Sequence, residues 1–174
     1  MCDFWIAEFS VIIQKSNMST IKSNLKQLGV ALPSAPKPLG NFAPFIIDQN
    51  TLMISGQISV DATGNVVRGK LGDDFSLEQG YKAARLCAIG LLARANAALD
   101  GELDRIEQLL KLGAFVNATP EFGDHPKVVN GASDFMVEAL GRKRGEHVRF
   151  AVGTSSLPSN AAVEIEAIFR VRTD

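Results

Sequence analysis

The chain has 174 residues, of which 46% are apolar and 21% charged, a composition that supports one folded domain and disfavours disorder. Its 18 lysines and arginines against 19 aspartates and glutamates leave a net charge of -1, which disfavours a nucleic-acid backbone as the main partner. The two cysteines, Cys2 and Cys87, cannot build a disulfide framework and lack metal-ligand spacing. No apolar run approaches the length of a membrane span, so we expect a soluble, cytoplasmic domain without a metal.

Residues 1–17 differ from the rest of the sequence and contain the only tryptophan. They lack the basic start of a secretory signal and the arginines of a mitochondrial presequence. We interpret them as an upstream N-terminal extension, with Met18 as the natural start of a single domain over residues 18–174. The hydrophobic residues of the extension are expected to pack on that domain as a short helix or strand.

The first half of the domain predicts a short helix followed by a β-meander. Residues 21–29 carry apolar residues at helical spacing and end at Gly29, and the prolines at 33, 36 and 38 then favour an extended linker. From Phe42 the apolar period changes to two, which is typical of strands separated by polar turns. The predicted strands of this half cover residues 43–47, 52–60 and 66–67.

The second half predicts two long helices, each followed by β-structure. The first helix runs from Ser76, a suitable N-cap, to Leu99, with apolar residues at spacings of three and four. The second covers 127–140, with Pro126 before it and Gly141 after it. Residues 103–110 are expected to add a further helical turn or two. The predicted strands of this half cover residues 112–117, 148–152 and 163–171.

This order gives three strands, a helix, a strand, a helix and two strands. A single mixed β-sheet with two main helices packed on one face is the natural packing for such an order, which is an α+β fold. The other face of the sheet would be open. Because large exposed apolar patches are uncommon on monomers, we expect an oligomeric partner there.

The last two strands contain the residues best suited to a site. Arg149 lies between Val148 and Phe150 in one strand, and Glu164 lies between apolar neighbours in the next. An arginine in such a strand either binds a carboxylate through two hydrogen bonds or pairs with a nearby acid. The spacing alone favours the second interpretation, an Arg149–Glu164 cross-strand ion pair that holds the register of the strands.

Other patterns indicate less. The basic run Arg142-Lys143-Arg144 is compatible with RNA binding, but it follows a predicted helix C-terminus, where cations complement the helix dipole. We favour the second interpretation because the run is short. Both histidines, His125 and His147, fall in polar loops of the predicted structure, so no Ser-His-Asp arrangement is indicated.

Two stretches carry more specific patterns. The first is RFAVGTSSLPSNAAVEIEAI at 149–168, in which an arginine strand, a Leu-Pro turn and a Val-Glu-Ile-Glu-Ala strand follow one another. The second is MISGQI at 53–58, followed by Asp61-x-x-Gly64. Both resemble the RidA/YjgF family, also described as endoribonuclease L-PSP-like. The predicted element order fits the family fold from about Pro36 to Arg172, and the chain is similar to a longer, less characterised branch.

The resemblance implies a chorismate-mutase-like α+β barrel, assembled as a homotrimer with ligand clefts between subunits. Enzymes of the family hydrolyse reactive 2-imino and enamine acids to 2-oxo acids and ammonia without a cofactor. By position, Arg149 would bind the substrate carboxylate, and Glu164 would hold or activate the attacking water as a general base. The other pocket residues that the resemblance implies are Ser55, Gly56, Phe42, Ala151 and Asn130.

The chain departs from the family pattern at two of these positions. Phe42 stands where members often have a tyrosine, so a hydroxyl that could assist the leaving amine is missing, and Ala151 stands where many have a cysteine. Uncatalysed imine hydrolysis is already quick, so an arginine and a carboxylate can suffice. The alternatives are a non-catalytic trimer that binds a small carboxylate and an endoribonuclease, which the net charge disfavours.

Overall fold

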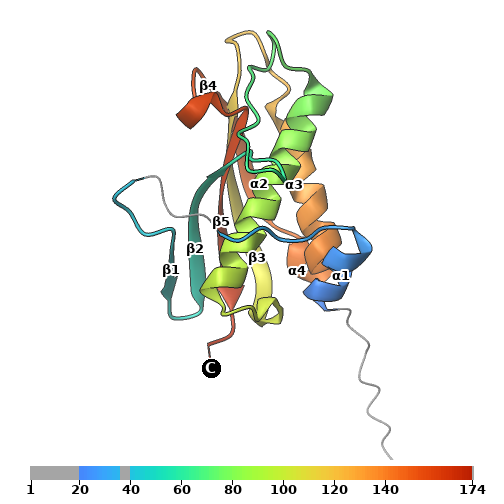
Figure 1. Cartoon of the computed structure of the whole chain (residues 1–174), viewed down its shortest axis with the longest axis vertical. Coiled ribbons are helices and arrows are strands. Elements are labelled where there is room, and N and C mark those ends of the chain that lie inside the picture. Colours follow the sequence, from blue (N-terminus) through green and yellow to red (C-terminus); the bar gives the residue numbers. More distant parts are fainter. Residues whose placement is uncertain (1–19, 36–39, 174) are drawn as a thin grey trace, which may run out of the picture.

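The computed structural model describes residues 20–35 and 40–173, which form one five-stranded mixed sheet with helices over one face (Figure 1). The sheet order is β1-β2-β5-β3-β4, and all neighbours are antiparallel except β3 and β4, which are parallel. The helices and strands in chain order are α1 (Ile21–Gln27), β1 (Phe45–Asp48), β2 (Thr51–Ile58), α2 (Leu77–Ala98), β3 (Ile106–Asn117), α3 (His125–Leu140), α4 (Arg142–Gly145), β4 (Val148–Thr154) and β5 (Val163–Val171).

The two long helices begin and end where the sequence predicts, within two residues. Ser76 caps α2, because its hydroxyl accepts a hydrogen bond from the Gln79 amide at 3.2 Å and the Gln79 side chain accepts one from the Ser76 amide at 2.8 Å. Pro126 occupies the first turn of α3, and Gly141 ends it at a φ of 80°. Both helices pack their apolar faces on the same side of the sheet, which confirms the predicted layers.

Two predicted elements are wrong. Residues 66–67 form no strand, because Val66 makes only an isolated bridge to Val60. Residues 103–110 are helical for one 3₁₀ turn, Leu103–Arg105, and β3 then starts at Ile106. Two register shifts against β5 in this part of β3 break the alternation of apolar residues. The pattern therefore resembled helical spacing, although β3 is the strand that pairs with both β5 and β4.

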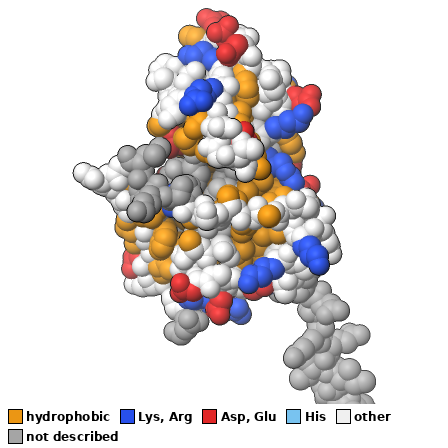
Figure 2. All heavy atoms as spheres, viewed as in Figure 1, with side chains coloured by type: hydrophobic (Ala, Val, Ile, Leu, Met, Phe, Trp, Pro, Cys, Tyr) orange, Lys and Arg blue, Asp and Glu red, His pale blue; other side chains and the backbone are white. Residues whose placement is uncertain are grey.

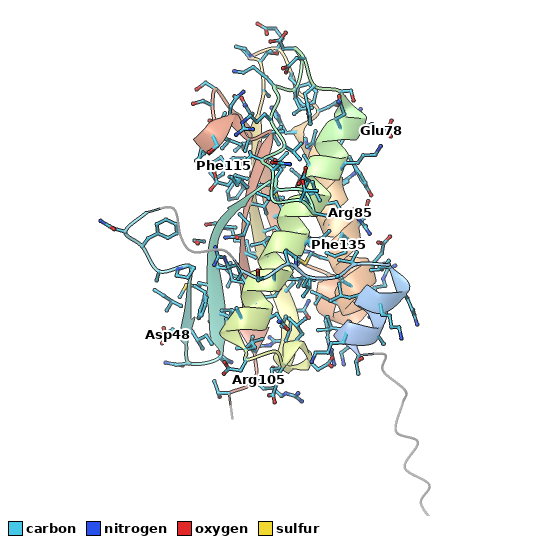
Figure 3. All side chains as sticks on the ribbon, viewed as in Figure 1. Asp48, Glu78, Arg85, Arg105, Phe115 and Phe135 are labelled. Atoms are coloured by element: carbon cyan, nitrogen blue, oxygen red, sulfur yellow. The ribbon has the colours of Figure 1, made fainter. Side chains whose placement is uncertain are left out.

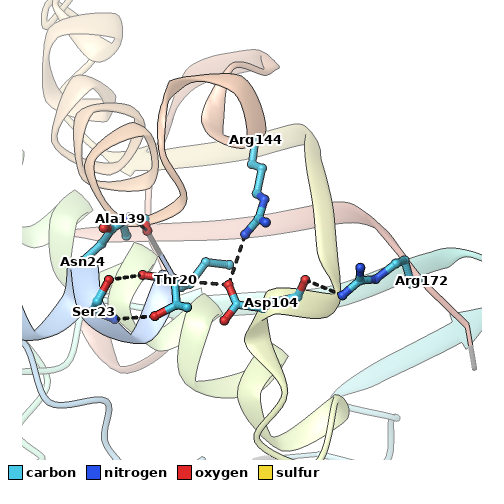
Figure 4. A network of polar contacts seen from close by, with 8 residues as sticks. Thr20, Ser23, Asn24, Asp104, Ala139, Arg144 and Arg172 are labelled. Carbon is cyan, nitrogen blue, oxygen red and sulfur yellow. Dashed lines mark hydrogen bonds and ion pairs between the residues drawn. The ribbon is translucent and has the colours of Figure 1, made fainter. Parts of the chain in front are cut away.

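Helix α1, at the start of the described chain, is hydrogen-bonded to residues near the start of β3 and the end of α3. The amide of Ile21 donates to Asp104 Oδ1 at 3.1 Å, and the Asn24 side chain donates to the Ala139 carbonyl at 2.9 Å (Figure 4). Arg144 pairs with the same Asp104 at 3.1 Å. The predicted extension over residues 1–17 and the linker prolines 36 and 38 lie outside the described residues.

The basic run predicted to follow a helix C-terminus folds into α4, and two of its side chains are paired. Arg142 pairs with Glu146 at 2.9 Å, and Arg144 pairs with Asp104. These pairs reduce the positive charge available to a phosphate backbone. Across residues 20–35 and 40–173, no helix is both long and apolar enough to cross a membrane.

The face of the sheet opposite the helices carries exposed apolar side chains. Phe115, Val152 and Met53 are 41%, 42% and 38% exposed, and the register places all three on this open face. Figure 3 shows Phe115 on the sheet, away from Arg85 and Phe135, which lie where α2 and α3 meet. Figure 2 shows further hydrophobic side chains around β1 and β2, where Ile46 is 54% exposed.

Replacing Gly131 by alanine is expected to lower the free energy of unfolding by about 3 kcal/mol, because it overpacks the contact between α2 and α3. An added Cβ would overlap the backbone carbonyl of Tyr81, which cannot move without shifting α2. Urea denaturation measures the loss. The matched control is Gly90→Ala, where the new Cβ would lie 3.5 Å from Gln57 Cβ, an ordinary contact. This control should leave stability unchanged or raise it by about 0.5–1 kcal/mol. Equal effects of the two changes would contradict the overlap.

Candidate functional site

Arg149 and Glu164 project from opposite faces of the sheet. β3 lies between β4 and β5, and its register sets Arg149 beside Leu112 and Ala167, but Glu164 beside Phe115. Leu112 and Ala167 are buried under the helices, whereas Phe115 lies on the open face. The predicted Arg149–Glu164 ion pair is therefore wrong, because the two strands are not neighbours and the two side chains point apart.

The guanidinium of Arg149 is bonded to helix α3 through three acceptors. Nη1 donates to Ser133 Oγ at 2.7 Å, and Nη2 donates to the Pro126 carbonyl at 3.0 Å and to Asn130 Oδ1 at 2.7 Å. Asn130, which the resemblance places among the pocket residues, thus lies in direct contact with Arg149. Partial burial lowers the pKa of Arg149 from its ordinary value, and the nearby Asp134 opposes that shift.

These contacts limit how Arg149 can hold a carboxylate. A guanidinium has five N–H groups and two edges that can donate two parallel hydrogen bonds, and both edges include Nη2. Both hydrogens of Nη2 are directed to Pro126 and Asn130. A carboxylate can therefore accept one hydrogen bond from Nε or Nη1 directly, and it gains a two-bond contact only when the Asn130 amide moves.

A serine and a histidine complete the surroundings of Arg149. Ser133 Oγ lies 3.0 Å from His147 Nε2, and His147 Nδ1 lies 2.6 Å from the Gly145 carbonyl oxygen. Burial is the main cause that lowers the pKa of His147, and the charge of Arg149 adds to it. Neither residue was predicted as part of the site. A usable signal was present for Ser133, because Asn130 and Ser133 are three apart on one face of a predicted helix, whereas His147 lies just before β4.

Glu164 lies in a separate, small pocket on the open face. The pocket has a volume of about 180 Å³ and is lined by Gly56, Phe115, Glu164 and Glu166. Burial raises the pKa of Glu164 above its ordinary value. Gly56 lies in an irregular part of β2, where the register against β5 shifts, and a Cβ there would overlap the Glu164 carboxylate. Glycine therefore makes the room that the carboxylate occupies.

Two of the remaining predicted residues lie near these sites, Ala151 near Arg149 and Ser55 near the Glu164 pocket. Ala151 is half-buried on the face of Arg149, and Ser55 adjoins Gly56 and donates from its hydroxyl to the Pro44 carbonyl at 3.0 Å. Phe42 is 52% exposed and is not among the residues that line the Glu164 pocket. Within the described ranges, no group of three or more histidine, cysteine, aspartate or glutamate side chains is placed to hold a metal.

Comparison with known proteins identifies the family. The profile of the family described as "YjgF/chorismate mutase-like, putative endoribonuclease" matches residues 22–169. The chain belongs to this YjgF/RidA family, and its α+β sheet with helices on one face is the fold that the family name denotes. The resemblance carried by the arginine strand and the Ser-Gly-Gln strand is thereby confirmed.

Three relatives indicate where in the family the chain lies. It is 38% identical to protein TCP17 of Trypanosoma cruzi over 148 residues, which cover 85% of this chain and 92% of TCP17. The structure of Atu1372 from Agrobacterium tumefaciens, a protein of unknown function, is 42% identical and superposes with a TM-score of 0.81 over 87% of this chain and 92% of that one. The 2-iminobutanoate/2-iminopropanoate deaminase of Dermatophagoides farinae is 25% identical over 140 residues, covering 80% of this chain and 92% of that one.

Proposed function

We propose that this protein hydrolyses 2-imino acids to 2-oxo acids and ammonia in clefts shared between identical copies, assembled as a homotrimer. The observation that carries the proposal is the placement of Arg149 and Glu164 on opposite faces of one sheet. One chain cannot direct both side chains to the same ligand. Two copies can, when the edge strand β4 of one copy, which carries Arg149, lies beside the open face of another, which carries Glu164. A deaminase among the relatives supports the reaction class.

In this proposal Arg149 binds the carboxylate of the imino acid and so orients its C=N bond. Glu164 of the adjacent copy takes a proton from water as the water oxygen forms a bond to the imine carbon, and it returns that proton to the imine nitrogen to give the carbinolamine. The carboxylate then takes the proton of the new hydroxyl and passes it to the amine nitrogen, so the carbonyl forms as the C–N bond breaks and ammonia leaves. A carboxyl whose pKa is raised by burial suits this role, because it is a stronger base than an ordinary carboxylate and still returns its proton readily.

The second candidate is a binding protein for small carboxylates that performs no reaction. One observation favours it: Phe42 supplies no hydroxyl to a leaving amine. The endoribonuclease function in the family description has less support here, because the net charge is -1 and Arg142 and Arg144 are paired.

Ammonia release from 2-iminobutanoate, generated in place by an amino-acid oxidase, tests the reaction. Glu164→Gln is expected to reduce the rate by about 100-fold, because a general base typically contributes 10²–10⁴-fold. The same change should leave thermal stability unchanged or raise it, since a carboxylate with a raised pKa is destabilising when ionised. As the pH falls through that raised pKa, the base is lost and the rate should decrease.

Mixing two inactive variants tests whether the site is shared. When Arg149→Lys and Glu164→Gln chains are refolded together in equal amounts, one half of the sites receive an intact arginine and one half of those an intact glutamate. About a quarter of the wild-type rate should therefore return if copies are exchanged at random within a closed ring. No recovery in a mixed assembly, or a stable monomer near 18.7 kDa in light scattering, would contradict a shared site. A wild-type protein that binds 2-oxobutanoate but releases no ammonia would support the binding protein.

A further inference from the structure

We infer that His147 and Ser133 are positioning residues that fix the guanidinium of Arg149, and that they hold it only while His147 is neutral. The inference adds a regulated hydrogen-bond relay to the candidate site, and its ligand assay rests on the proposed function. The relay runs from the Gly145 carbonyl through His147 and Ser133 to Arg149, with contacts of 2.6, 3.0 and 2.7 Å.

The direction of each hydrogen bond follows from the partners. The Gly145 carbonyl can only accept, so Nδ1 of His147 carries the hydrogen at the 2.6 Å contact. In neutral imidazole Nε2 then has a lone pair, and the Ser133 hydroxyl donates to it. The serine oxygen keeps its own lone pairs, one of which accepts from Arg149 Nη1. With His147 neutral, each group in this relay therefore has a matching partner and the Ser133 hydrogen is used.

Protonation of His147 disturbs the relay in two ways. Nε2 becomes a donor, so Ser133 must rotate its hydroxyl hydrogen away and accept from both His147 and Arg149. The imidazolium also places a positive charge across one serine from the guanidinium. Burial is the main cause that lowers the pKa of His147, the hydrogen bond to Gly145 opposes it, and the charge of Arg149 adds to the lowering. We expect the Nη1 group of Arg149 to be held less firmly when His147 becomes charged, while Nη2 keeps its hydrogen bonds to Pro126 and Asn130.

The acidic side chains on the surrounding elements have other partners, so none of them is placed as a counter-ion for a protonated His147. On α3, Asp134 accepts from the Tyr81 hydroxyl at 2.9 Å. Other charged residues on α2, α3 and α4 form the ion pairs Arg85–Glu138, Lys127–Asp124, Arg142–Glu146 and Arg144–Asp104, and Lys143 of α4 is exposed. Among the described residues no carboxylate is paired with His147, so an imidazolium there would have no counter-ion.

The hydroxyl of Ser133 is better suited to holding Arg149 than to acting as a nucleophile. A serine bonded to a histidine resembles a nucleophile and its base, but here the serine oxygen also accepts a charge-assisted hydrogen bond from Nη1 at 2.7 Å. That bond withdraws the electron density that a nucleophile needs. The same bond is what a positioning residue supplies.

Rotation of the Nη1 group of Arg149, followed by nitrogen-15 NMR of the full chain, tests the inference without any ligand, because Nη1 is the group that contacts Ser133. We expect slow rotation in the wild type at pH 8, faster rotation below the pKa of His147, and fast rotation at both pH values in Ser133→Ala. Ser133→Thr keeps the hydroxyl and should restore slow rotation. His147→Gln offers an amide oxygen that accepts from Ser133 and does not titrate, so slow rotation should persist at acid pH.

The second measurement is the dissociation constant for 2-oxobutanoate, a stable 2-oxo acid. Ser133→Ala should raise it by about 10-fold at pH 8, because one hydrogen bond to a charged group is lost. His147→Gln should stay within about threefold of the wild type at pH 8 and lose the weakening at acid pH. The matched control is His125→Gln, which should keep the wild-type pH profile. Protonation of Glu164 would favour an anionic ligand, so it cannot produce the expected weakening.

Unchanged Arg149 rotation in Ser133→Ala, or acid weakening that persists in His147→Gln, would overturn the inference. The proposed function fails separately. If the wild type binds no 2-oxobutanoate and releases no ammonia, the rotation measurements still decide whether His147 and Ser133 fix Arg149.

Discussion

Arg149→Lys is expected to weaken binding of 2-oxo and 2-imino acids by about 30- to 1000-fold, with a similar loss of imine hydrolysis. Lysine keeps the positive charge, but it has one nitrogen where arginine has three, and that nitrogen is strongly hydrated. It cannot contact Ser133, Asn130 and a ligand together in the directions that the guanidinium uses. The loss therefore reflects geometry and not net charge.

The same change should also loosen the contact between β4 and α3, because three hydrogen bonds join them through Arg149. We expect the free energy of unfolding to fall by about 1–2 kcal/mol, which leaves the protein folded. Arg85→Lys is the matched control, since Arg85 also joins two elements: from α2 it pairs with Glu138 of α3 and stacks on Phe135 of α3 at 4.6 Å. That control should keep wild-type affinity. If activity in Arg149→Lys fell only in proportion to the unfolded fraction, the arginine would have a structural role alone.

Asn130→Asp is expected to reduce carboxylate binding by about 100-fold, although aspartate has nearly the same shape as asparagine. The side-chain oxygen of Asn130 lies 2.7 Å from Nη2 of Arg149, so an aspartate there would form a charged hydrogen bond with the guanidinium. The ligand would then have to displace a carboxylate where it now has to displace a neutral amide. Thermal stability should stay the same or rise, because the arginine gains a counter-ion.

Asn130→Ala separates this charge effect from a loss of shape. It removes the acceptor and leaves one Nη2 hydrogen free, so we expect 2-oxobutanoate affinity within about fivefold of the wild type. Isothermal titration calorimetry at pH 8 measures both variants beside the parent. Wild-type affinity in Asn130→Asp would show that the ligand carboxylate does not contact Arg149.

The sequence predicts the helices well because their signals are local. Ser76 and Pro126 mark helix starts, and apolar residues at spacings of three and four cover each buried face. The start of β3 could not be predicted in the same way. Its two register shifts against β5 depend on a strand more than fifty positions later in the chain, and they interrupt the alternation near Ile106 and Leu109.

The sequence predicts which strand face each predicted site residue occupies, but not how the strands bring these faces together. Alternation gives the correct face within each strand, so Arg149 and Ala151 share a face, and so do Glu164 and Glu166. It does not give the order of strands, and consecutive strands β4 and β5 are separated by β3. The contact between Ser133 and His147 could not be predicted for the same reason, because it depends on how α3 lies against the edge of the sheet.

The opposite orientations of Arg149 and Glu164 also affect how the activity per chain depends on the protein concentration. If each site takes one group from each of two copies, a dissociated chain carries both groups and completes no site. Activity per chain would then fall on dilution, by mass action, at concentrations where every chain is still folded. A cell that halves the supply of such a chain, at a concentration near the dissociation constant of the assembly, loses more than half of its catalytic capacity. A ligand that bridges two copies restores part of it.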